Sequence, residues 1–195
     1  MEMDKRVWKP GNMLYPLPAV LVSVGDESGR TNILTVAWTG TICTNPAMVY
    51  ISVRPERYSY PMLVKSGEFV INLTTSRLAR ATDYCGVRSG RDVDKWKETG
   101  LHAGNSVSLS YTPVIEESPV NIECKVTEIK ELGSHHMFLA EVAAVQADEA
   151  YFDENGKFGL NESGLLVYSH GEYLGLGERL GSFGYSVKKK KKGTK

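Results

Sequence analysis

The sequence has few cysteines and no excess of charge of either sign. Among its 195 residues are three cysteines, none in a C-x-x-C pair, and an odd number cannot all pair within one chain. We therefore expect free, mostly buried thiols in a reducing compartment, and a cytoplasmic protein. Basic and acidic residues number 23 each, so the formal net charge is zero and nothing in it favours nucleic acid or a membrane as a partner.

Long apolar runs are also missing. The first 15 residues contain no apolar core of a signal peptide, and no run approaches the roughly 18 apolar residues of a membrane-spanning helix. A dinucleotide-binding motif is missing too, because Gly175, Gly177 and Gly181 are spaced G-x-G-x-x-x-G and no acidic residue follows to hold a ribose. We interpret these glycines as a tight turn of the C-terminal segment over the domain or against a partner subunit.

The sequence indicates neither a metal site nor a catalytic nucleophile. His135 and His136 are adjacent on a predicted strand, so they point to opposite faces and cannot chelate one metal together. No Ser-His-Asp or Cys-His arrangement stands out. Cys85 lies at a predicted helix end, where the helix dipole raises the pKa of a thiol and makes it a poor nucleophile.

The pattern of apolar residues is mainly that of β-strands. We predict one mainly β domain over residues 1–187, a barrel with a few short helices laid over it, and a disordered basic tail over residues 188–195. The predicted strands are 19–24, 32–37, 48–53, 68–73, 121–129, 136–145 and 165–168. Residues 25–29 have the chemistry of a hairpin turn, and residues 120–147 form a long antiparallel hairpin.

Three short helices are predicted. The first covers residues 59–65 and ends before Gly67. The second runs from a cluster of N-cap residues at 74–76 to about Tyr84. The third covers residues 92–98, with Asp92 as its N-cap and Gly100 as its stop signal.

Hydroxyl and guanidinium side chains gather in two neighbouring segments. Residues 32–46 read as a buried strand interrupted by threonines. Threonine forms strands well, so an ordinary strand without a ligand is the alternative here. A second cluster of polar residues lies between the end of a buried strand and the start of a helix. Forked arginine guanidinium groups and the free backbone amides of a helix start are suited to bind a phosphate monoester. A solvated turn is the alternative for this group, which consists of Ser52, Arg54, Arg57, Tyr58 and Ser59.

Two further segments are candidates. Ser89, Gly90 and Arg91 make a tight turn that carries another cation, with a plain helix-to-helix loop as the alternative. His135 is a candidate to face a ligand, and an exposed hairpin residue is the alternative there.

Four motifs resemble, in the same order, the flavin reductase-like family of FMN-binding split barrels, and within it the flavoredoxin type. The resemblance covers roughly residues 12–190. It rests on "NILTVAWTGTICTNPAMVYISVRPERYSY…SGEFVINL", "ATDYCGVRSGRDVDKW", "LGSHHMFLAEV" and "YLGLGERLGSFGYSVKK".

The resemblance implies a site for each part of an FMN cofactor. Ala37, Trp38, Thr39, Gly40 and Thr41 would line the isoalloxazine ring, and Ser52, Arg54, Arg57, Tyr58 and Ser59 would hold the phosphate. A loop closing over the flavin would supply Cys85, Ser89, Gly90 and Lys95. His135 would be the catalytic residue, near the flavin face where nicotinamide docks, although Ser134 stands where many relatives have an aspartate that could orient the histidine.

The resemblance also implies a homodimer and an activity. NADH or NADPH would pass hydride to flavin N5, which makes the protein an NAD(P)H:flavin oxidoreductase. Reduced flavin would then leave, or electrons would pass to a redox protein. The alternatives are a flavoredoxin-like electron carrier that takes electrons from a protein partner, and a non-catalytic, regulatory barrel that binds flavin or another small ligand.

Overall fold

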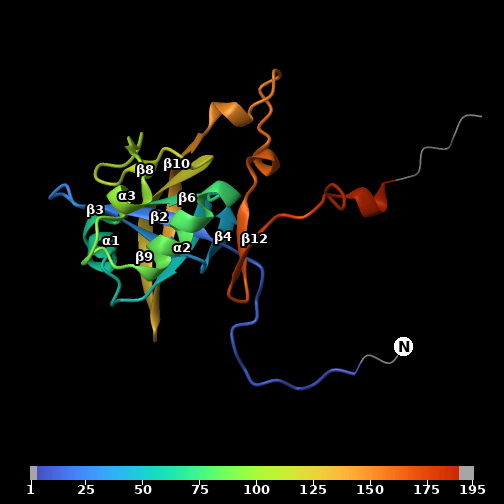
Figure 1. Ribbon diagram of the computed structural model, residues 1–195, viewed down its shortest axis with the longest axis horizontal. Coiled ribbons are helices and arrows are strands. Elements are labelled where there is room, and N and C mark those ends of the chain that lie inside the picture. The colour runs from blue at the N-terminus through green and yellow to red at the C-terminus, as the bar shows by residue number, and fades with distance from the viewer. Residues whose placement is uncertain (1–3, 189–195) are drawn as a thin grey trace, which may run out of the picture.

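The centre of the molecule is one curled, antiparallel sheet. The computed structural model describes residues 4–188; nearly all of the predicted basic tail lies outside the described residues. Seven strands follow the order β3-β2-β6-β9-β10-β5-β4 (Figure 1). They are β2 (Val20–Gly25), β3 (Thr31–Val36), β4 (Thr39–Thr44), β5 (Ala47–Val53), β6 (Glu68–Asn72), β9 (Val120–Leu132) and β10 (His135–Ala147).

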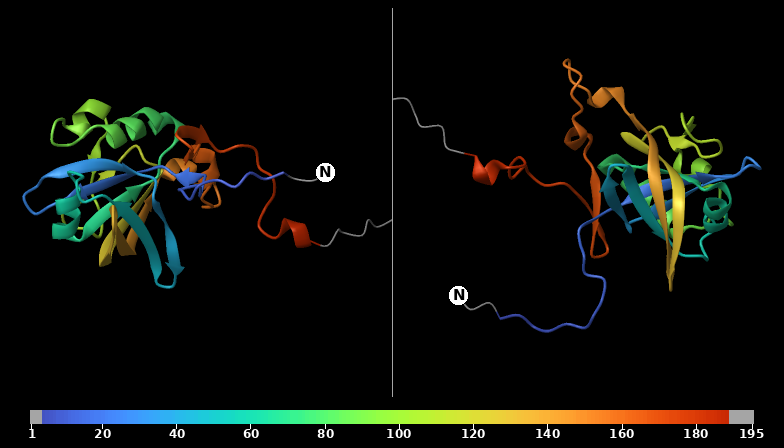
Figure 2. Two further views of the ribbon diagram at one scale, coloured as in Figure 1. Left: turned by 90° about the horizontal axis from the view of Figure 1, so that it is seen from below. Right: turned by 180° about the vertical axis from the view of Figure 1, so that it is seen from behind.

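The two edge strands of this sheet are consecutive in the chain. Only Ala37 and Trp38 separate β3 from β4, so the sheet curls until its edges meet at this link. The edges are not hydrogen-bonded to each other, and the hairpin of β4 and β5 turns away from β2 and β3 (Figure 2, left). The barrel is therefore open along β3. The prediction of a mainly β barrel with few short helices is confirmed, although β4 is a strand that the predicted set omitted.

Smaller elements cover one end and one side of the sheet. A three-stranded sheet has the order β1-β11-β12, formed by β1 (Leu17–Pro18), β11 (Leu166–Ser169) and β12 (Glu172–Gly175). A two-stranded ribbon joins β7 (Ala103–Gly104) to β8 (Val114–Ile115). The 3-10 helices are η1 (Ser76–Leu78), η2 (Glu149–Tyr151), η3 (Leu160–Ser163) and η4 (Tyr185–Val187).

The core has two clusters because both faces of β2 are covered. Val20, Val22 and Val24 point into the barrel, where they join Phe69 and Phe138. Leu21 points the other way, into a second cluster with Ile33, Leu78 and Cys85. Successive side chains of a strand alternate between faces, so a strand covered on both faces is apolar throughout.

The α-helices are α1 (Tyr60–Ser66), α2 (Ala79–Val87) and α3 (Lys95–Thr99). Gly67 and Gly100 end α1 and α3 in left-handed conformation, as predicted. Two predicted caps are wrong. Asp92 donates its backbone N–H to the Ser89 carbonyl in an earlier turn, whereas Asp94 caps α3 by accepting from Trp96 N (3.1 Å) and Lys97 N (3.3 Å).

The cluster at 74–76 also fails to cap α2, which begins only after η1. Thr75 makes no side-chain cap hydrogen bond. The Thr74 hydroxyl is used elsewhere, because it donates to the carbonyl of Ala19. Its hydrogen bond joins the start of this segment to the sheet instead of to the helix.

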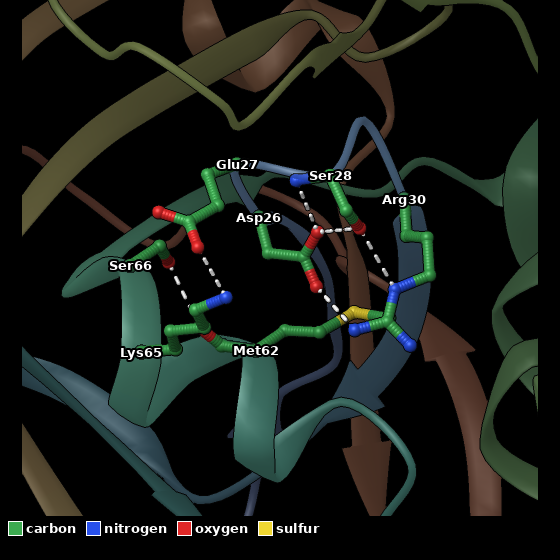
Figure 3. Close-up of polar contacts among 7 residues, drawn as sticks. All are labelled: Asp26, Glu27, Ser28, Arg30, Met62, Lys65 and Ser66. Carbon is green, nitrogen blue, oxygen red and sulfur yellow. Dashed lines mark hydrogen bonds and ion pairs between the residues drawn. The ribbon is translucent and has the colours of Figure 1, made fainter.

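The turn between β2 and β3 is built around one carboxylate (Figure 3). Asp26 accepts hydrogen bonds from the Ser28 backbone N–H (2.9 Å) and hydroxyl (2.5 Å), and from Arg30 (2.7 Å). These bonds, that of the Ser28 hydroxyl foremost, lower the pKa of Asp26 to about 2. Lys65 pairs with Glu27 at 2.5 Å, so the turn is also tied to α1. The predicted hairpin turn is confirmed.

A second carboxylate, that of Glu123, holds the loop before β8. Glu123 is fully buried and accepts from Val107 N (2.9 Å), Ser108 N (2.8 Å), the Ser108 hydroxyl (2.6 Å) and Gln146 Nε2 (2.8 Å). Burial raises the pKa of this carboxyl, and the hydrogen bonds lower it by more, so the pKa lies below its ordinary value. The folded state therefore stabilises the ionised form of Glu123.

Replacing Glu123 with Gln should destabilise the protein by about 1–3 kcal/mol at pH 7, because a donor NH₂ replaces one acceptor oxygen among buried donors. A lowered folded-state pKa contributes stability that is complete above the unfolded-state pKa and is lost as pH falls through the folded value. The difference between wild type and E123Q in urea unfolding should therefore shrink between pH 7 and about pH 3. Glu128→Gln, at an exposed position, is the control. Equal stability of E123Q and wild type at pH 7 would contradict this account of the loop.

Candidate functional site

A cleft runs along β3, where the barrel is open. It has two adjoining parts of about 540 Å³ and about 430 Å³. Both parts are lined by Leu34 and Thr35 of β3, Arg54 and Arg57 after β5, and Gly86 and Val87 of α2. The shared lining makes them one continuous cleft. We name the larger part the cationic half and the smaller part the aromatic half.

The cationic half holds five basic side chains and a single acidic one, Glu56. Within residues 4–188, none of the five forms an ion pair. Arg57 donates to the carbonyl of Gly86 (3.2 Å), and Arg91 donates to the carbonyl of Glu56 (3.3 Å). Forked guanidinium groups that lack carboxylate partners are suited to a phosphate or carboxylate ligand. The basic residues are Arg54, Arg57, Arg88, Arg91 and Lys95.

Lys95 is the buried member of this group. It begins α3, and its Nζ donates to the carbonyls of Ile33 (2.8 Å) and Cys85 (2.7 Å). Burial is the main cause of a Lys95 pKa lowered to about 8, an effect that Cys85 opposes and the nearby Arg57 reinforces. The ammonium thus lies at the cleft with no negative partner among the described side chains.

Cys85 behaves as predicted, for a different reason. Burial raises the pKa of its thiol to about 11, and the charge of Lys95 only partly opposes that effect. Desolvation is therefore the larger cause, not the helix dipole. All three cysteines are free.

Gly90 packs directly against two side chains and leaves no room for a side chain of its own. A Cβ at this position would lie 2.5 Å from Asn32 Oδ1 and 2.7 Å from Tyr58 Cδ1. Asn32 in turn donates from Nδ2 to the hydroxyl of Ser59 (2.7 Å), and both residues are buried. The turn after α2 therefore approaches β3 and the start of α1 closely because residue 90 is glycine.

The aromatic half contains the predicted histidine. The rings of His135 and Trp38 have centroids 4.2 Å apart, and 37% of Trp38 remains exposed. Burial, with Arg54 as the next cause, lowers the pKa of His135, so the imidazole is neutral at pH 7. His136 points to the opposite face, where its Nδ1 lies 2.7 Å from the Tyr60 hydroxyl, which confirms the prediction that the two histidines diverge.

Most residues that the sequence singled out line this cleft. The cationic half includes Arg54, Arg57, Tyr58, Ser59, Cys85, Ser89, Gly90 and Lys95. The aromatic half includes Ala37, Trp38, Ser52, Arg54, Arg57 and His135. Four separate segments of the sequence, around residues 37–38, 52–59, 85–95 and 135, thus meet in one place.

Three predicted residues on β4 do not line the cleft. The hydroxyl of Thr39 donates to the Tyr50 carbonyl (2.6 Å), Gly40 lies against the Tyr50 ring, and Thr41 is exposed. The chain turns at Ala37 and Trp38, which carries β4 to the far edge of the sheet. A role for these three residues stays a prediction.

The sequence interpretation missed several lining residues. Arg88 directly precedes the candidate turn of Ser89, Gly90 and Arg91, so its position in the same motif was an available signal, and Arg91 of that turn lines the cleft as well. Asn32, Thr35, Gly86 and Val87 also line the cleft, and Thr35 belongs to the threonine-rich segment. Other residues had no local signal because only the fold brings them to the aromatic half: Asp83, Tyr168, Gly171 and Tyr173.

Other kinds of site find no support in residues 4–188. They contain no group of three or more His, Cys, Asp or Glu side chains placed to hold a metal ion. The helices in this part of the chain are too short or too polar to cross a membrane.

Comparisons with known proteins agree with the fold. The model of the flavin reductase like domain matches residues 13–177. The flavoredoxin of Desulfovibrio vulgaris (Miyazaki F) is 28% identical, with a TM-score of 0.87 over 95% of this chain and 100% of that one. The flavoredoxin of Methanosarcina acetivorans is 26% identical, with a TM-score of 0.84 over 95% of this chain and 100% of that one. An uncharacterised protein of Pyrococcus abyssi is 29% identical over 86% of this chain and 95% of its own length. These likenesses confirm the predicted split barrel of flavoredoxin type.

Lys95 should titrate near pH 8 in the protein alone, because its burial disfavours the charged form. NMR of the lysine side chains, with Lys95→Arg to assign the signal, measures this pKa. Inorganic phosphate should raise it, because an anion in the cleft favours the ammonium, and Arg57→Ala should raise it by removing a like charge. A Lys95 pKa near the usual 10.5, unaffected by phosphate, would contradict a buried cation in an anion site.

Proposed function

The chain belongs to the flavin reductase-like domain family, and from this membership we propose that it is an FMN-binding oxidoreductase whose flavin is reduced by NADH or NADPH. The observation that carries the proposal is the cationic half, with its five basic side chains and single carboxylate. The aromatic half continues directly from it. A ligand with an anionic end and a flat ring matches a cationic surface that continues into an aromatic one.

The phosphate of FMN fits the cationic half. Arg54 and Arg57 stand at the junction of the two halves, and Lys95 supplies a buried ammonium between β3 and α2. Gly90 lets the turn that it shares with Ser89 lie directly against Asn32 and Tyr58, all of which line this half. Charge-assisted hydrogen bonds to phosphate oxygens are about twice as strong as neutral ones.

The flavin ring fits the aromatic half. Trp38 and His135 provide a ring surface, and Tyr168 and Tyr173 of the three-stranded sheet line the same half. Bound there, the flavin supplies a ring nitrogen, N5, that accepts hydride from reduced nicotinamide. The chain's own task is to bind and orient the two reactants, since hydride transfer depends on proximity and alignment.

The charges of the cleft also favour the reduced flavin. Arg54 and Arg57 line both halves, so they place positive charge beside an electron-rich ring. His135 is neutral at pH 7 and adds no further charge, and its ring packs against Trp38, where it orients a nicotinamide docked over the ring. Orientation is the role that we assign to His135.

An electron carrier is the second candidate function. The likeness to two flavoredoxins favours it. In this case FMN stays tightly bound and receives electrons from a protein donor, and the same cleft residues hold it.

Assembly and location complete the proposal. We propose a single-domain protein, residues 1–187, that forms a homodimer in the cytoplasm, where three free cysteines stay reduced. A redox protein is the partner that would accept electrons from the reduced flavin.

Replacing Arg57 with Ala should weaken FMN binding by about 1.5–3 kcal/mol, the contribution of a hydrogen bond to a charged group. Its exposure places the expected loss at the lower end of that range. Quenching of FMN fluorescence on titration measures the dissociation constant. Arg77→Ala is the matched control, because Arg77 is exposed and lines neither half. An unchanged dissociation constant for R57A would remove Arg57 from the site.

Anaerobic mixing of the FMN-loaded protein with NADH or NADPH should bleach the flavin absorbance within the stopped-flow time range. His135→Gln should slow this bleaching by roughly tenfold with little change in FMN affinity, because it disturbs only the orientation of nicotinamide. If neither nicotinamide bleaches a flavin that dithionite does reduce, the protein is not the nicotinamide-dependent enzyme, and the electron carrier and the non-catalytic barrel remain.

A further inference from the structure

Both ends of the described chain are extended arms that expose large apolar side chains. The N-terminal arm (residues 4–16) precedes β1, and the C-terminal arm (residues 176–188) follows β12. Both stand away from the body of the molecule (Figures 1 and 2). Leu180 is 85% exposed and Phe183 is fully exposed. The other large apolar side chains of the two arms that are exposed are Val7, Trp8, Met13, Leu14, Leu176, Tyr185 and Val187.

The C-terminal arm has a definite local shape near its end. The Tyr185 ring covers Gly181, where a Cβ would lie 2.5 Å from the ring. Tyr185 N donates to the Ser182 carbonyl (2.9 Å), and Gly184 is in left-handed conformation before η4. The turn formed in this way presents Phe183 outward. Apolar side chains exposed together in this way mark a surface for interaction.

An apolar groove lies at the base of the two arms. Its volume is about 290 Å³, enough for a few apolar side chains, and strands β1, β2 and β11 contribute to it. It is lined chiefly by Leu17, Val20, Leu73, Leu165, Val167 and Leu176. The C-terminal arm of the same chain starts at this groove with Leu176 and then leads away from it (Figure 1).

We propose that the C-terminal arm clasps a second copy of this chain and places Leu180 and Phe183 in the apolar groove of that copy. The inference rests on the homodimer of the proposed function and names the segment that holds it together. Each copy carries both the arm and the groove, which is the self-complementarity that a two-fold symmetric interface requires.

The exposed area of the arms matches the size of a dimer interface. An aromatic side chain buries about 150–250 Å² in full, so Phe183, fully exposed, and Trp8 and Tyr185, about two thirds exposed, together offer on the order of 340–570 Å² per chain. A standard interface buries about 800 Å² per partner, and the aliphatic side chains of the arms supply the remainder.

The test is the self-association of wild type and of the double variant L180S/F183S, measured by sedimentation equilibrium. The variant should dissociate with a constant at least about 30-fold higher, the loss typical of interface hot spots. Val107→Ser is the matched control, because Val107 is 72% exposed but lies in neither arm nor groove, and it should dimerise like wild type. A double variant that dimerises as strongly as wild type would overturn the role of the arm and leave the dimer intact.

A cross-link identifies the surface that Phe183 touches. Phe183→p-benzoylphenylalanine, irradiated in a mixture of ¹⁵N-labelled and unlabelled protein, should join peptides of two different chains, one of them from the groove. Cross-links only within one chain would overturn the proposal, as would a wild type that is monomeric. Sedimentation of wild type with vesicles of equal parts phosphatidylcholine and phosphatidylserine, lost in L180S/F183S, would overturn it in favour of a lipid surface. FMN titration of the same samples tests the flavin site independently.

Discussion

The buried ammonium of Lys95 is the constraint on which the cleft depends. Its two hydrogen bonds join the Ile33 carbonyl of β3 to the Cys85 carbonyl of α2, so they fix the wall of the cleft against the sheet. Taking an ion out of water costs several kcal/mol when no opposite charge accompanies it. The two carbonyl dipoles offset part of this desolvation cost, and the part that they do not offset lowers the pKa of Lys95. An anion in the cleft would offset what the carbonyls do not, which explains why a cation is kept at this position.

The open edge of the barrel explains why such a site forms beside β3. An edge strand has backbone groups that no neighbouring strand pairs. On β3 one of these, the Ile33 carbonyl, accepts from Lys95, while the Thr35 side chain donates to the Thr82 carbonyl of α2. Helix α2 therefore covers the edge through side-chain bonds and leaves a cleft beside it. A closed barrel would have paired these groups with β4 and left no space for a ligand.

Local chemistry predicted those parts of the site that are local in the sequence. Arg54, Arg57 and Ser59 fall within one short segment, so their convergence could be inferred without a fold. Thr39 and Thr41 share the composition of that region, but a two-residue link sends their strand to the opposite edge of the sheet, which composition does not reveal. The burial of Lys95 and the approach of Tyr173 depend on contacts between distant segments. The cap at Asp94 instead of Asp92 shows the same limit on a small scale, because the Ser89 turn decides where α3 begins.

The three-stranded sheet of β1, β11 and β12 connects the cleft to the arms. Gly171, in the turn between β11 and β12, and Tyr168 and Tyr173 line the aromatic half, and the C-terminal arm leaves the same hairpin at Gly175. A second copy that seats this arm would restrain the sheet, and hence the wall that faces the flavin ring. Restraint of a ligand-binding wall lowers the entropy lost on binding. Linkage is reciprocal, so flavin that orders this wall would in the same measure strengthen the association of the two copies.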